Sequence, residues 1–136
     1  MEKKKLVLSA QLPSLETLIT FVLDEARTQG MDAKKLNHLR LAAEELLVNI
    51  IRYAYPEQTG DIEVTVTPLA EGGIEVEIMD SGKPFDPLSL PEPDIQTPLE
   101  QRKIGGLGIF LVRRLMDSVR YERRGNQNVI TFSKKN

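Results

Sequence analysis

The sequence predicts an α+β protein, a two-layer sandwich in which about three helices cover one face of a mostly antiparallel, mixed sheet. Two observations predict it. Segments with alternating apolar and polar residues come in pairs joined by short turns that contain glycine, as in β-hairpins. Three other segments have apolar residues at three- and four-residue steps, the pattern of helices that bury one side. No internal repeat or second core is visible, so residues 1–136 are expected to form one domain.

The composition narrows the class of protein. The chain has 136 residues, a net charge of −2 and no cysteine. The mixed charge argues against a nucleic-acid binder, which usually has a basic face. The lack of cysteine excludes disulfides and thiolate metal sites. No apolar run has the length of a membrane span, so we expect a cytoplasmic protein without membrane contact.

Residues 4–10 alternate and are expected to form an edge strand, which a helix follows. Pro13 and Ser14 open this helix, with Ser14 as its N-cap, and Gly30 closes it. Its apolar stripe consists of Leu15, Leu18, Ile19, Val22, Leu23 and Ala26.

The longest helical pattern runs over residues 36–56, with Asp32 as a possible N-cap and Pro56 at its end. Glu45 and Asn49 lie four residues apart, so they stack on consecutive turns beside the apolar stripe. A carboxylate can accept a proton from a hydroxyl group, and an amide oxygen can ligate Mg²⁺. Taken alone, this pair is better read as ordinary polar residues on a helix flank.

The second half of the chain predicts two hairpins with a helix between them. The alternating segments are residues 62–68, 74–80, 119–123 and 129–133. Their turns lie at Gly72-Gly73 and Gly125-Asn126. Residues 81–103 contain five prolines and little periodicity, and a helical pattern over residues 109–116 follows. A loop of this length in a compact domain is usually functional or disordered.

Two further motifs suggest a ligand site. Asp80 and Gly82 form a D-x-G turn after a strand, where the carboxylate could accept a hydrogen bond from an exocyclic amine such as that of adenine. Gly105, Gly106 and Gly108 precede a helix, whose N-terminal amides favour an anion. Each motif alone also fits a plain turn or a flexible loop. The glycine spacing is not that of a P-loop.

The order of these motifs resembles that of the anti-sigma-factor serine kinases, within the gyrase-, chaperone- and histidine-kinase-type ATPases of the Bergerat fold. The resemblance covers about residues 8–134. The motifs that carry it are AAEELLVNIIRYAYPE, IMDSGKPFDP and GGLGIFLVRRLMDSVRY. Phe85-Asp86-Pro87 and Ala54-Tyr55 are particular to this branch.

The resemblance implies a role for each matching residue. Glu45 would be the general base towards an acceptor serine, and Asn49 would hold Mg²⁺ between the phosphates of ATP. Asp80 would bind the adenine amino group, and Gly82 would pass under the ring. Residues 81–104 would form an ATP lid. Gly106 and Gly108 would contact the phosphates, with help from Gly105. Arg102 or Lys103 could neutralise the phosphate charge, or the two could be only a solvated basic pair.

The implied function is a serine/threonine protein kinase that phosphorylates an anti-sigma-antagonist protein and sequesters a sigma factor. A homodimer is also implied, with the N-terminal strand and first helix as the place to look for its interface. One alternative is a nucleotide-gated binding module of the same fold without catalysis. Another is a structural α+β domain without a nucleotide site, which would have to produce three ordered motifs by chance.

Two departures from the family pattern stand out. Tyr53 occupies the place of a histidine that is common near the end of the first motif. The Gly-Thr often found before the last strand is replaced, because the chain reads Gly125-Asn126-Gln127-Asn128-Val129. This puts in doubt adenine contacts from the last strand, such as any through Thr131. A histidine kinase proper is not expected, because the chain is too short for a separate dimerisation and phosphoacceptor helix pair.

Overall fold

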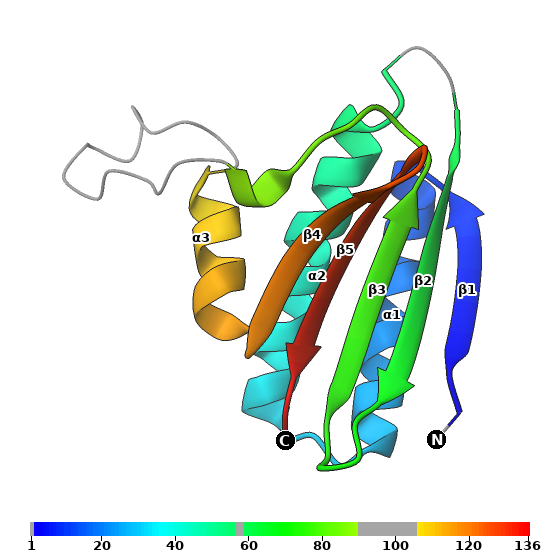
Figure 1. Cartoon of the computed structure of the whole chain (residues 1–136). Helices are drawn as coiled ribbons and strands as arrows, with labels where there is room; N and C mark the ends of the chain where they lie inside the picture. Colours follow the sequence, from blue (N-terminus) through cyan, green and yellow to red (C-terminus); the bar gives the residue numbers. More distant parts are fainter. Residues whose placement is uncertain (1, 57–58, 90–105) are drawn as a thin grey trace, which may run out of the picture.

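The computed structural model describes residues 2–56, 59–89 and 106–136 (Figure 1). The elements are β1 (Lys4–Ser9), α1 (Leu12–Thr28), α2 (Ala33–Tyr53), β2 (Asp61–Pro68), β3 (Ile74–Asp80), the short 3₁₀ helix η1 (Pro87–Ser89), α3 (Gly106–Leu115), β4 (Ser118–Arg124) and β5 (Gln127–Lys134). The predicted α+β sandwich is confirmed. The side chains of residues 106 and 107 lie outside the description.

The five described strands form one sheet in the order β1-β2-β3-β5-β4. Every pairing between them is antiparallel, so the expectation of a mixed sheet is wrong. The edge position predicted for β1 is confirmed. Because β5 lies between β3 and β4, the last strand runs beside the end of β3, and Asp80 is opposite Asn128. This register brings together two residues that are far apart in the sequence.

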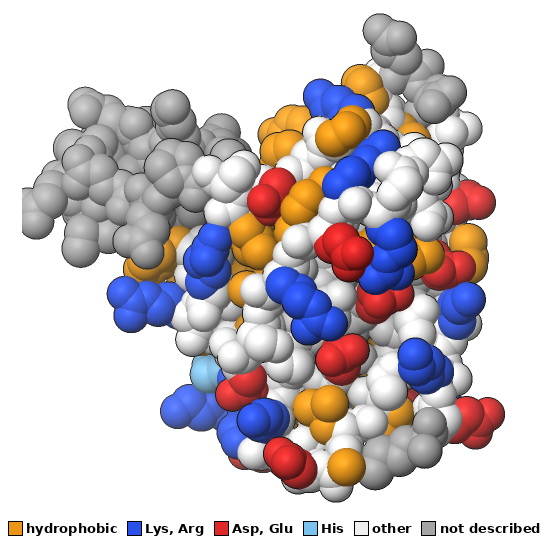
Figure 2. Space-filling model, viewed as in Figure 1, with side chains coloured by type: hydrophobic (Ala, Val, Ile, Leu, Met, Phe, Trp, Pro, Cys, Tyr) orange, Lys and Arg blue, Asp and Glu red, His pale blue; other side chains and the backbone are white. Residues whose placement is uncertain are grey.

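Figure 1 shows α1 and α2 against one face of the sheet, with α3 beside α2. The apolar side chains of α1, α2 and the inward-facing strand positions are buried between the layers. The largest of them include Leu18, Ile19, Leu39, Leu47, Ile62, Ile78 and Phe132. Figure 2 looks at the uncovered face of the sheet, where acidic and basic side chains are interspersed. The core therefore lies on one side of the sheet only.

The helix ends show one success and one failure of local sequence rules. The Asp32 side chain accepts a hydrogen bond from the Lys35 amide at 2.9 Å, so this N-cap is confirmed. The prediction of Ser14 as N-cap is wrong: α1 begins at Leu12, and Gln11 is the N-cap residue. Pro13 suits the first helical turn, because its missing amide hydrogen is not needed there. The Ser14 hydroxyl instead lies 3.4 Å from that of Ser9.

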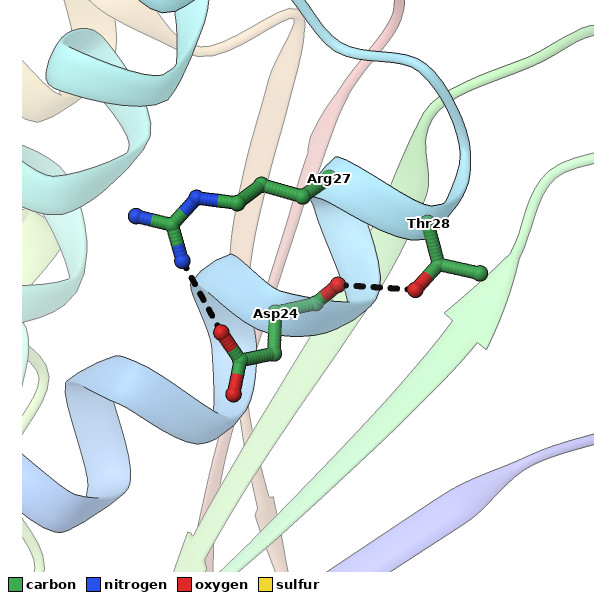
Figure 3. A network of polar contacts seen from close by, with 3 residues as sticks. All are labelled: Asp24, Arg27 and Thr28. Carbon is green, nitrogen blue, oxygen red and sulfur yellow. Dashed lines mark hydrogen bonds and ion pairs between the residues drawn. The ribbon is translucent and has the colours of Figure 1, made fainter.

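The C-terminal end of α1 carries a small polar network (Figure 3). Arg27 Nη1 donates to Asp24 Oδ1 at 2.9 Å, and the Thr28 hydroxyl donates to the Asp24 carbonyl at 3.0 Å. All three side chains are exposed, and exposed ion pairs add little to stability. Gly30 follows with a positive φ of 85°, which agrees with its predicted role at the helix end.

Within the described ranges, no helix combines the length and the hydrophobicity needed to cross a bilayer.

Candidate active site

Glu45 and Asn49 lie on one side of α2, as their spacing predicts. Asn49 Nδ2 is 3.5 Å from Glu45 Oε1, which makes a long hydrogen bond. Asn49 is buried, with 7% of its surface exposed, whereas Glu45 is half-buried. The carboxylate is thus nearer to solvent than the carboxamide.

Asp80 is buried at the end of β3 and is held by two hydrogen bonds to one oxygen. Its Oδ1 accepts from the Gly82 amide at 2.9 Å and from Asn128 Nδ2 at 2.9 Å. Its Oδ2 has no hydrogen-bond partner among the described residues. The carboxylate is therefore fixed at one oxygen and available at the other.

Asn128 is the residue that sequence reasoning missed. Its Oδ1 accepts from the Tyr121 hydroxyl at 2.6 Å and from the Phe85 amide at 3.2 Å, and its Nδ2 also donates to the Lys83 carbonyl at 2.8 Å. The unusual residues before the last strand were the available signal. Thr131, the residue of the last strand considered above for adenine contacts, is the pairing partner of Glu77. Its side chain lies on the opposite face of the sheet from that of Asn128.

Gly82 lies against the end of α2. A Cβ at this position would overlap the Ala54 carbonyl, and the next amide, that of Lys83, donates to the same oxygen at 3.0 Å. Glycine is therefore required for the close approach of two backbones. The role under an adenine ring that the resemblance implies for Gly82 stays a prediction.

Tyr55 connects three parts of the site. Its hydroxyl donates to the Asp61 carbonyl at 2.8 Å and accepts from the Ser81 amide at 2.7 Å. Burial raises the pKa of this hydroxyl above its ordinary value, an effect that the Ser81 amide partly opposes and nearby Asp80 strengthens. Tyr55 therefore stays protonated at neutral pH and ties α2 to the start of β2 and to the residue after Asp80.

Asp80 and Asn49 line a small cavity of about 20 Å³ with mostly apolar walls. Its other lining residues are Leu46, Ile50, Ala54, Ile78, Phe85, Pro87, Tyr121, Asn128 and Ile130. This volume is enough for about one water molecule. Phe85 and Pro87 belong to residues 81–89, here called the covering segment, which would have to move for a larger ligand to enter.

A second, open hollow of about 410 Å³ also borders Asn49. It is lined by Leu41, Glu44, Glu45, Val48, Asn49, Arg52, Tyr53 and Gly108. Asn49 thus lines both spaces. Phe85 lines the cavity and Tyr53 lines the hollow, and the centroids of their rings are 6.0 Å apart. An extended ligand could therefore reach from Asp80 past Asn49 to Glu45.

The N-terminal part of α3 packs beside Glu45. The helix begins at Gly106, and a Cβ on Gly108 would overlap the Glu45 carboxyl group.

Two arginines hold the covering segment. Arg113 of α3 donates to the Leu88 carbonyl, and Arg123 Nη1 of β4 donates to the Gly82 carbonyl at 2.9 Å. Arg102, Lys103 and Gly105 lie outside the described residues, as does the part of the predicted lid beyond residue 89.

A metal ion at this site would depend on the bound ligand. Among the described residues, no group of three His, Cys, Asp or Glu side chains could hold a metal. The Asn49 amide oxygen accepts from no donor among the described residues, and Asn49 lines both spaces, so this oxygen could serve as a single protein ligand. Mg²⁺ is commonly bound by one or two protein oxygens together with substrate phosphates.

Residues 8–134 match the family described as the histidine kinase-like ATPase domain. The chain belongs to this family. The superfamily predicted from the motifs is therefore confirmed. Two of its relatives are serine-protein kinases RsbW. The one from Bacillus thuringiensis (strain Al Hakam) is 32% identical over 98 residues, and the one from Bacillus cereus (strain G9842) is 33% identical over 98 residues. These alignments cover 69% of the chain and 61% of each relative, so the chain spans about three fifths of their length.

Two solved structures share the fold of this chain. The RsbU and RsbW domains of Rv1364c from Mycobacterium tuberculosis match with a TM-score of 0.70 and 14% identity, over 99% of this chain and 32% of that one. The histidine kinase domain of the Erythrobacter litoralis EL346 blue-light activated histidine kinase matches with a TM-score of 0.56 and 13% identity, over 89% of this chain and 60% of that one. At these identities the likeness concerns the fold alone.

Proposed function

We propose that the chain binds ATP and transfers its γ-phosphoryl group to a serine of an anti-sigma-antagonist protein, and that it sequesters a sigma factor as a homodimer. The observation that carries the proposal is the position of Asn49, between the cavity that ends at Asp80 and the hollow that contains Glu45. This arrangement suits a ligand with a planar apolar end and a charged end. The names of the RsbW relatives support the choice of serine as acceptor.

The base of the nucleotide would occupy the apolar cavity. Oδ2 of Asp80, which has no partner among the described residues, would accept a hydrogen bond from the exocyclic amine of adenine, which is a donor. Phe85 and Pro87 would move outwards with the covering segment to make room. The apolar walls would stabilise the ring through burial, as in most small-molecule sites.

The phosphates would lie along Asn49 towards the open hollow. When Mg²⁺ is bound, it would be held by Asn49 and the phosphate oxygens, and it would reduce the negative charge there. Arg52 lines the same hollow and adds a positive charge. The N-terminus of α3, which begins at Gly106, would add amide donors and a favourable helix dipole. Arg102, Lys103 and Gly105 remain candidates for further phosphate contacts.

The acceptor serine would approach through the hollow beside Glu45. The Glu45 carboxylate would take the hydroxyl proton as the serine oxygen attacks the γ-phosphorus, and the bond from the γ-phosphorus to the bridging oxygen would break to release ADP. Charge stabilisation by the surrounding donors usually accelerates such transfers more than the proton acceptor does. Glu45 is half-buried and open to this hollow, which suits contact with a protein acceptor.

One observation favours a second candidate, a nucleotide-gated binding module without catalysis. Leu41 and Tyr53, 51% and 43% exposed, lie at the same hollow, where they could contact a partner whether or not a phosphoryl group is transferred. Phosphate transfer separates the two candidates. Tight ATP binding with no transfer to any antagonist protein would favour the binding module.

The first experiment is calorimetric titration with Mg-ATP of the wild type, Asp80→Asn and the exposed turn variant Asn126→Ala. In Asp80→Asn the amide oxygen can still accept from Gly82 and Asn128, so the fold should persist while an NH₂ group replaces the free acceptor. We expect binding by the wild type and Asn126→Ala and a strong loss in Asp80→Asn. Absence of binding by the wild type would contradict the proposal.

A further inference from the structure

We infer that Asn128 is a positioning residue for base recognition, which fixes the Asp80 carboxylate so that its second oxygen selects purines bearing a 6-amino group. The inference rests on the proposed function, since it concerns the same nucleotide site. It adds a determinant of specificity on β5, a strand to which the motifs assign no site residue.

The hydrogen bonds of Asn128 use the full capacity of its carboxamide. Nδ2 donates to Asp80 Oδ1 and to the Lys83 carbonyl, at 2.9 and 2.8 Å. Oδ1 accepts from the Tyr121 hydroxyl and from the Phe85 amide, at 2.6 and 3.2 Å. A carboxamide has two donor hydrogens and two acceptor lone pairs, so no capacity is left. Asn128 is 5% exposed, and four hydrogen bonds fix its side chain.

Only one orientation of the amide is compatible with these partners. If the group were flipped, its oxygen would face the Asp80 carboxylate and the Lys83 carbonyl, which are both acceptors. Its NH₂ group would then face the Phe85 amide, which is only a donor. Two contacts between acceptors and one contact between donors would then replace three buried hydrogen bonds, which would lower stability. The orientation therefore follows from the surrounding backbone.

The fixed amide in turn determines what Asp80 offers to a ligand. Asp80 Oδ1 already accepts from Gly82 and Asn128, so the carboxylate cannot rotate without losing both bonds. Asp80 lines the cavity, and its Oδ2, which has no partner among the described residues, is then the acceptor that it can offer to a ligand. A base with an amino group there gains a hydrogen bond, and a base without one leaves the carboxylate unpaired. The same amide holds Lys83 and Phe85, so recognition is connected to the covering segment.

The test compares ATP with purine riboside 5′-triphosphate, which lacks the 6-amino group, in calorimetric titrations of the purified chain with Mg²⁺. A hydrogen bond to a charged acceptor should make the wild type prefer ATP by roughly 10- to 100-fold. In Asn128→Ala the carboxylate keeps only the hydrogen bond from Gly82 and is held less firmly, so the preference should fall to about threefold or less. Tyr121→Phe keeps the ring and removes one hydrogen bond to Oδ1 of Asn128, so it should reduce the preference for ATP to an intermediate value.

The ratio of the two affinities separates positioning from a structural role. A variant that only loosens the fold weakens both nucleotides equally and leaves the ratio unchanged. Asn126→Ala is the control and should keep the wild-type ratio. An unchanged ratio in Asn128→Ala and Tyr121→Phe, with the wild type discriminating, would overturn the inference and leave ATP binding intact. If the wild type binds neither nucleotide, the proposed function fails and the inference with it.

Discussion

Gly108 of α3 faces the carboxyl group of Glu45 on α2 with no room for a side chain between them. A Cβ at position 108 would overlap the Glu45 Cδ, Oε1 and Cγ atoms. The glycine therefore has a packing role beside the candidate base, separate from any contact of its amide with phosphate. It allows the start of α3 to lie close to the residue that would handle the proton.

Gly108→Ala should displace either the Glu45 side chain or the N-terminal turn of α3. We expect a loss of phosphate transfer of roughly 100-fold, because small displacements of catalytic groups cost about this much. The measurement is the rate of phosphorylation of a co-purified antagonist protein. Leu111→Ala, at an exposed position of the same helix, is a suitable control. Equal transfer rates in both variants would show that the close contact is not needed.

Glu45→Gln should retain ATP binding and lose transfer. Glutamine has nearly the same shape, so packing against Gly108 persists, but it cannot accept the serine proton. General-base catalysis contributes roughly 100- to 10,000-fold, and a loss in this range is expected. Calorimetry and single-turnover transfer should be measured on the same preparation. Glu44→Gln is the matched control, because Glu44 is the adjacent residue of α2 and lines the same hollow. Unchanged transfer in Glu45→Gln would remove Glu45 as the base.

Tyr55→Phe should lower the free energy of unfolding by about 1–3 kcal/mol, because the Ser81 amide and the Asp61 carbonyl lose their common partner. Phenylalanine would still pack against Gly60, which lies under the ring. Urea unfolding at neutral pH measures the change. Tyr53→Phe is the control on an exposed ring in α2. Equal stabilities of Tyr55→Phe and the wild type would mean that the hydroxyl contributes nothing.

The raised pKa of Tyr55 also predicts a pH dependence. The hydroxyl ionises first in the unfolded chain, near its ordinary value of 10.0, and only at higher pH in the fold. Above pH 10 the unfolded state therefore binds fewer protons, and stability falls as pH rises. Unfolding curves between pH 9 and 11 should show a smaller decline in Tyr55→Phe than in the wild type. Parallel declines would contradict this assignment.

The ion pair between Lys4 of β1 and Glu25 of α1 should matter more than the other surface pairs. Lys4 Nζ lies 2.9 Å from Glu25 Oε2, and the Glu25 carboxylate is buried. The hydrogen bond with Glu25 raises the pKa of Lys4. Lys4→Met should lower the midpoint of thermal unfolding, because a buried carboxylate loses its partner. Lys5→Met, whose pair with Glu63 is longer at 3.6 Å, should change it little.

Local interactions in this fold were predictable from the sequence, whereas those between distant segments were not. The Asp32 cap, the glycine turns at Gly72 and Gly125 and the stacking of Glu45 on Asn49 were all predictable, because each depends on residues a few positions apart. The cap assigned to Ser14 was wrong, because the chain turns into α1 earlier and its hydroxyl is near Ser9 instead. Local rules named the right helix with the wrong first residue.

The sequence by itself determined which segments are helices and strands, and that Glu45, Asn49, Asp80 and Gly108 are the residues to examine. Only the tertiary structure decided that Asn128 holds Asp80, that Asn49 lines two separate spaces and that Gly108 touches Glu45. The reason is physical. Periodicity and capping act over a few residues, whereas the Asp80–Asn128 bond joins positions 48 apart and exists only because β5 pairs with β3 in this register.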